Sequence, residues 1–60
     1  MNKHRTIEAM RQHGGSFVRA LAEAWLRGDE LNRQKIEAAW RETWLRYEAM
    51  AERMEEKAHD

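Results

Sequence analysis

An apolar stripe with helical spacing occupies the second half of this chain. Its members recur at steps of four and three residues, at Ile36, Trp40, Trp44, Tyr47, Ala51, Met54 and Ala58. No proline occurs in the chain, and no glycine follows Gly28. This periodicity predicts one amphipathic helix over residues 30–58, about 44 Å long at ~1.5 Å per residue. So long an apolar ridge must be covered, and the rest of the chain can barely cover it.

A pair of glycines marks the end of a first, short helix. Gly14 and Gly15 are predicted to supply the left-handed backbone that commonly closes a helix, here one over residues 3–13. Ser16 follows directly and belongs to the residue types whose side chains cap helix N-termini. These adjacent stop and start signals predict that a second helix begins here.

A second pair of stop and start signals lies at Gly28 and Asp29. Gly28 is predicted to close the second helix, over residues 16–27, and Asp29 is placed to cap the third, which begins at Glu30. The three helices, short, buried and long, are expected to form one all-α domain over residues 1–60, as a helical hairpin or bundle. Acidic residues crowd its C-terminal end, so we expect the last turns to fray.

The second helix is apolar over most of its circumference. After Ser16 its polar side chains fall four residues apart, at Arg19, Glu23 and Arg27. A helix of this kind is buried on more than one side. The first helix offers only Ile7, Ala9 and Met10 to cover it. We therefore expect a second copy of the chain to complete the fold, in a dimer or a higher oligomer.

The large apolar side chains of the second and third helices are the predicted core and oligomer interface. They are Phe17, Leu21, Trp25, Ile36, Trp40, Trp44, Tyr47 and Met54. Trp25 is expected to oppose the aromatic ridge of the third helix. Aromatic side chains on one helix face bury a large area and find polar partners at its rim. Packing therefore explains this set better than a stacking platform for nucleic-acid bases.

Positive and negative charges balance over the whole chain but not along it. Lys plus Arg and Asp plus Glu each number 11, so the formal charge is zero. Residues 1–35 carry three net positive charges, and residues 36–60 carry three net negative charges. Two chains packed head to tail, or one folded as a hairpin, would bring these opposite charges together. Within the third helix, Glu37 and Arg41 stand four residues apart and are expected to pair.

Arginines supply most of the positive charge. They account for 8 of the 11 basic residues, and arginine favours bidentate contacts to carboxylates and phosphates. Arg19, Arg27 and Arg33 are candidate partner-binding residues, although an ordinary solvated surface explains them as well. The alternative function is a small DNA-binding regulator that uses Arg27, Arg33 and Lys35. A zero net charge opposes it, because non-specific binding to nucleic acid depends on positive charge.

No pattern for catalysis, a cofactor or a metal is present. The chain has no cysteine, and its histidines, His4, His13 and His59, are too widely spaced for a zinc site. It lacks a glycine-rich phosphate loop and a nucleophile elbow. Its longest apolar runs are three residues, against the roughly 20 of a membrane span, and no secretory signal is recognisable. We expect a cytoplasmic protein that is not an enzyme and holds no cofactor.

The stretch from His13 to Trp25, HGGSFVRALAEAW, resembles short uncharacterised proteins of phages and prophages. The resemblance extends over about residues 13–48, through Asp29, Asn32, Ile36-Glu37-Ala38-Ala39 and Trp44-Leu45-Arg46-Tyr47. Many of those proteins carry a proline just before the aromatic pair, whereas Trp40-Arg41-Glu42-Thr43 has none. The resemblance implies an accessory role in a bacterial host and supplies no functional residues. We expect a small accessory protein that binds itself and a host or phage protein, which it inhibits or modulates.

Overall fold

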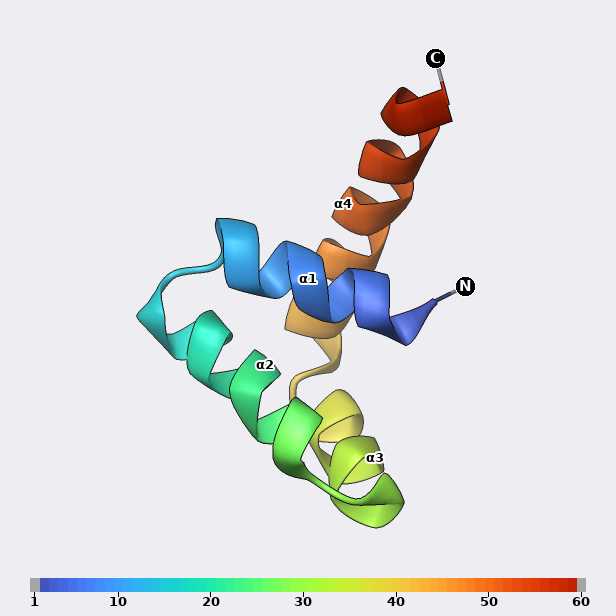
Figure 1. Cartoon of the computed structure of the whole chain (residues 1–60). Coiled ribbons are helices and arrows are strands. Elements are labelled where there is room, and N and C mark those ends of the chain that lie inside the picture. Colours follow the sequence, from blue (N-terminus) through green and yellow to red (C-terminus); the bar gives the residue numbers. More distant parts are fainter. Residues whose placement is uncertain (1, 60) are drawn as a thin grey trace.

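The computed structural model describes residues 2–59, with side chains for residues 2–54, and these form four helices (Figure 1). They are α1 (Lys3–His13), α2 (Ser16–Arg27), α3 (Glu30–Ala39) and α4 (Arg41–His59). The all-α prediction is confirmed, and the predicted bounds of the first two helices agree with the structure. The prediction of three helices is wrong, because the long third helix is divided into α3 and α4. Fraying of the last turns stays a prediction.

The break between α3 and α4 lies at Trp40. Its φ of −117° and ψ of 42° fall outside the helical region. Its N–H donates to the carbonyl of Ile36 at 3.0 Å, and its own carbonyl accepts from the N–H of Trp44 at 2.9 Å. No proline or glycine causes the break. Instead, α3 lies against α2 while α4 turns to lie across α1 (Figure 1). A straight helix cannot make both contacts, so tertiary packing overrides local helix propensity.

The core lies mainly between α1 and α4. Four side chains of α1 are almost fully buried: Thr6, Ile7, Ala9 and Met10. The buried face of α4 is formed by Trp44, Tyr47 and Ala51. By contrast, α2 buries only Ala22 and Trp25. Within one chain α2 is therefore buried on one side only, because α1 covers the aromatic ridge and no described element covers the outer side of α2. Burial of that outer side against a second copy stays a prediction.

Side chains cap two of the helix N-termini. The Asn2 carboxamide oxygen accepts from the N–H of His4 at 2.9 Å, a cap that sequence reasoning missed. The predicted cap of the third helix is confirmed, since Asp29 Oδ1 accepts from the N–H of Asn32 at 2.9 Å. The predicted Ser16 cap is wrong. Ser16 is already the first residue of α2, and Gly15 occupies the cap position, where it has no side chain to accept a hydrogen bond.

Gly14 is required by a close approach rather than by a left-handed backbone. No glycine in the chain has a positive φ, so the predicted left-handed closure is wrong. Gly14 leaves α1 in an extended conformation, with φ −80° and ψ 156°, and its N–H donates to the carbonyl of Met10 at 2.9 Å. A Cβ added to Gly14 would lie 2.5 Å from both the Met10 carbonyl oxygen and Val18 Cγ1. The α1–α2 turn is therefore too tight for a side chain at this position.

We predict that Gly14→Ala destabilises the fold while Gly15→Ala does not. The added methyl at Gly14 forces a backbone shift, which typically costs ~1–3 kcal/mol. At Gly15 nothing lies within 4 Å of an added Cβ, and its φ of −74° suits alanine. There the smaller entropy of the unfolded chain is expected to stabilise by about 0.4–1 kcal/mol. Urea unfolding followed by circular dichroism measures both, and equal stabilities of the two variants would contradict this account of the turn.

Candidate protein-interaction surface

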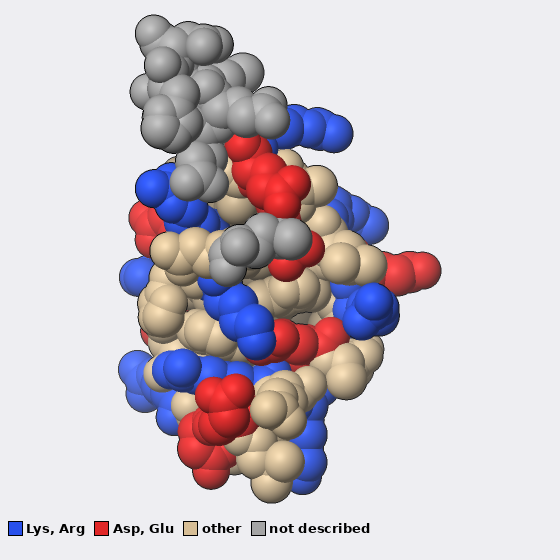
Figure 2. All heavy atoms as spheres, turned by 90° about the vertical axis from the view of Figure 1, so that its right-hand side faces the viewer, with Lys and Arg blue, Asp and Glu red and all other residues tan. Residues whose placement is uncertain are grey.

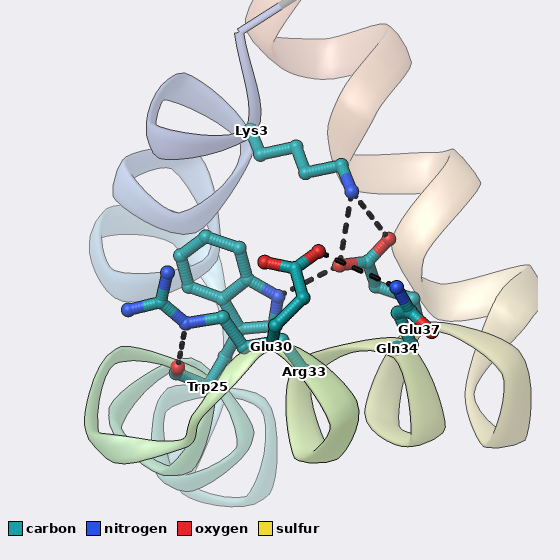
Figure 3. A network of polar contacts seen from close by, with 6 residues as sticks. All are labelled: Lys3, Trp25, Glu30, Arg33, Gln34 and Glu37. Atoms are coloured by element: carbon teal, nitrogen blue, oxygen red, sulfur yellow. Dashed lines mark hydrogen bonds and ion pairs between the residues drawn. The ribbon is translucent and has the colours of Figure 1, made fainter.

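The Trp25 indole lies at the centre of a polar network between α1, α2 and α3 (Figure 3). Its Nε1–H donates to Glu37 Oε2 at 2.9 Å, and Lys3 Nζ lies 3.1 Å from the other oxygen of that carboxylate. Arg33 Nε donates to the Trp25 carbonyl at 2.9 Å, and its Nη2 donates to the Leu26 carbonyl at 3.2 Å. The Arg33 guanidinium also lies 4.2 Å from the centre of the indole. Arg33 thus satisfies the end of α2 and joins it to α3.

Two further aromatic contacts complete the surroundings of Trp25. His4 of α1 meets the indole edge-on, with ring centres 5.6 Å apart. Trp44 of α4 lies 5.8 Å away at an interplanar angle of 38°. The predicted opposition of Trp25 to the aromatic ridge is therefore confirmed at Trp44. With only 2% of its surface exposed, Trp25 touches a side chain from each of the other three helices.

The outer side of α2 and the end of α3 form an exposed apolar surface. Phe17 is 55% exposed and Trp40 is 44% exposed. Their rings meet edge to face with centres 5.0 Å apart. Trp40 also lines a groove of about 480 Å³ between the two helices, together with Ala24, Arg27, Gly28, Asn32, Lys35, Ile36 and Ala39. We call this groove, together with Phe17, the α2/α3 surface.

The polar lining of the groove is neutral or basic. Arg27 and Lys35 contribute its two charges, and no acidic residue lines it. Both side chains are exposed, and neither forms a hydrogen bond or an ion pair with any residue in the described part of the chain. Alanines and a glycine supply much of the remaining lining. The lining of the groove therefore combines small and apolar side chains with two positive charges.

The structure divides the predicted core and interface residues into three groups. Trp25, Trp44 and Tyr47 are buried, Leu21 and Ile36 are half-buried against the core, and Phe17, Trp40 and Met54 are exposed. Packing within one chain therefore explains only some of these eight apolar residues. The exposed members are those that the packing of one chain leaves without cover.

The three candidate partner-binding arginines have different surroundings. Arg33 is held by α2 carbonyls, whereas Arg27 lies at the α2/α3 groove. Arg19 lines a separate polar groove between α1 and α2, where Arg11 and Glu23 approach to 3.4 Å. Figure 2 shows acidic and basic side chains interspersed on the face that it views, rather than a field of one sign.

Glu37 has partners other than the one that its sequence spacing predicts. Its expected partner was Arg41, four residues further on. Because the helix ends before Trp40, the carboxylate instead binds the Trp25 N–H and Lys3. A buried indole N–H signals that an acceptor is needed. Spacing does not identify that acceptor, because the pairing depends on how α3 packs against α2.

Among the residues that the structure describes, no group of three or more His, Cys, Asp or Glu side chains could hold a metal ion. None of the four helices has a stretch apolar enough over sufficient length to cross a bilayer. Comparison with protein-family models, curated proteins and solved structures finds no match to this chain.

We predict that Glu37→Ala destabilises the fold more than Glu37→Gln. Alanine leaves the buried Trp25 N–H without its acceptor, which costs about 1–3 kcal/mol. Glutamine keeps an acceptor oxygen and loses only the ion pair with Lys3, whose side chain is 52% exposed. Such a pair contributes ~0–1 kcal/mol. Chemical denaturation measures both free energies, and equal losses would show that the hydrogen bond to Trp25 contributes little.

Proposed function

We propose that this chain is a small accessory protein that acts by protein–protein contact, self-association included, through the α2/α3 surface. The observation that carries the proposal is the exposed Phe17–Trp40 pair beside an apolar groove. Contiguous exposed apolar surface rimmed by polar groups is typical of interaction sites. Exposed aromatic side chains next to a pocket are the usual anchors of protein interfaces.

The packing of the chain supports this assignment. The α1 helix covers the buried face of α4, so no element remains to cover the outer side of α2. The resulting groove is open along two helices and has alanines in its lining. Small side chains let a partner backbone approach closely, and an amphipathic helix is a common occupant of such a groove. Contact alone would perform this function, so the proposal requires no catalytic group.

The resemblance to short phage proteins supports the accessory role. It covers about residues 13–48, which include Phe17, Trp40 and the whole lining of the groove. The resemblance implies an accessory role in a bacterial host, which binding to a host or phage protein would provide. We propose the same role here, with self-association as the form in which the surface is covered when that partner is absent.

We predict that Phe17→Gln weakens self-association while Leu31→Gln leaves it unchanged. Phe17 anchors the proposed interface, and losing such an anchor typically costs about 2 kcal/mol, or roughly 30-fold in Kd. Leu31 is equally open, at 61% exposed, but lies outside the groove and the aromatic pair. Light scattering after gel filtration and sedimentation equilibrium measure the mass. Equal effects of the two variants would contradict a role for this particular surface.

We predict that duplex DNA is not the ligand. Arg33 of the proposed DNA-binding set is held by α2 carbonyls, and the formal charge of the chain is zero. A labelled random duplex at about 50 mM salt is a lenient test, because binding through about six phosphates weakens roughly a thousandfold by 200 mM. We expect no binding at the lower salt. Micromolar binding that collapses at the higher salt and is lost in Arg27→Ala/Lys35→Ala would favour the regulator instead.

A further inference from the structure

The positive charge of the α2/α3 groove favours a partner that carries negative charge. Arg27 and Lys35 are its only charged lining residues, and neither is neutralised within the described part of the chain. Two copies joined groove to groove would bring these like charges together, which disfavours that arrangement. A helix with an apolar face and acidic flanks would complement both the apolar lining and the two positive charges of the groove.

The C-terminal part of α4 has this character. In Figure 1 it extends past α1 at the opposite end of the molecule from α3. The apolar stripe of α4 continues there through half-buried Met50 to Met54, which is 37% exposed. From Glu48 onward the sequence is mainly acidic, with Glu48, Glu52, Glu55, Glu56 and Asp60 against Arg53 and Lys57. This end of α4 thus combines a partly exposed methionine with excess negative charge in its sequence.

We propose that the α2/α3 groove of one copy binds the acidic end of α4 from a second copy, and that the contact is reciprocal. The groove and the end of α4 lie toward opposite ends of a molecule 36 Å long, so a two-fold, head-to-tail pair brings both complementary contacts together. Methionine side chains adapt to an irregular apolar lining. Arg27 and Lys35 then face the glutamates that flank the stripe. This inference rests on the proposed function and specifies its partner.

Charge reversal on each side of the contact tests the proposal. The groove variant is Arg27→Glu/Lys35→Glu, and the helix variant is Glu48→Lys/Glu52→Lys. Each variant alone opposes like charges in both contacts, so we expect its self-association to weaken at least about tenfold. A mixture of the two restores opposite charges in both contacts, so we expect a heterodimer close to the wild-type affinity. Arg11→Glu/Arg41→Glu reverses two exposed charges outside the groove and is the matched control.

Sedimentation of fluorescently labelled variants, alone and mixed, measures each of these affinities. Self-association of the helix variant at wild-type strength, combined with its loss in Phe17→Gln, would overturn the α4 contact and leave the proposed surface standing. A mixture that fails to associate although both variants are folded by circular dichroism would also overturn it. If the wild-type chain stays monomeric at hundreds of micromolar and Phe17→Gln changes nothing, both this inference and self-association through the surface fail.

Discussion

The contacts of one indole hold the four helices together. Trp25 donates to Glu37, lies under Arg33, meets His4 edge-on and packs on Trp44. A 60-residue chain without cysteine has a small core and no covalent cross-link. Loss of a buried tryptophan typically costs ~3–5 kcal/mol, which is as much as the whole stability that a core of this size usually supplies. The relative positions of α1, α2, α3 and α4 therefore depend on this one side chain.

The break at Trp40 follows from the same packing and creates the candidate surface. On its C-terminal side, Trp44 and Tyr47 point into the core against α1. At the break itself, Trp40 faces outward and meets Phe17. The apolar stripe that looks continuous in the sequence therefore serves two surfaces, one inside the molecule and one outside it. A helix without the break would turn Trp40 to the same side as Trp44, because residues four apart share a helix face.

Local signals in the sequence predicted the bounds of two helices and one cap, but not the backbone geometry at Gly14 or the residue that caps α2. The bounds of α1 and α2, the Asp29 cap and the contact between Trp25 and the ridge all follow from neighbouring residues or from periodicity. The break at Trp40 did not, because the apolar period runs through it without proline or glycine. The partners of Glu37 and Arg33 were also beyond reach, since both depend on the packing of α2 against α3. The sequence predicted the exposed surface only indirectly, because the first helix offers too few apolar side chains to cover the second helix.

The lack of side chains that could cover the outer side of α2 links folding to association. Among the described residues, most of the apolar side chains of α1 pack against α4. The outer side of α2 therefore lacks a neighbour, although many of its side chains are apolar. A partner that covers this side binds the folded chain and not the unfolded one, so it stabilises the fold by mass action. Phe17 and Trp40, which are 55% and 44% exposed, would therefore add to stability when the surface is occupied. An interface at this surface would thus draw binding energy and fold stability from the same side chains.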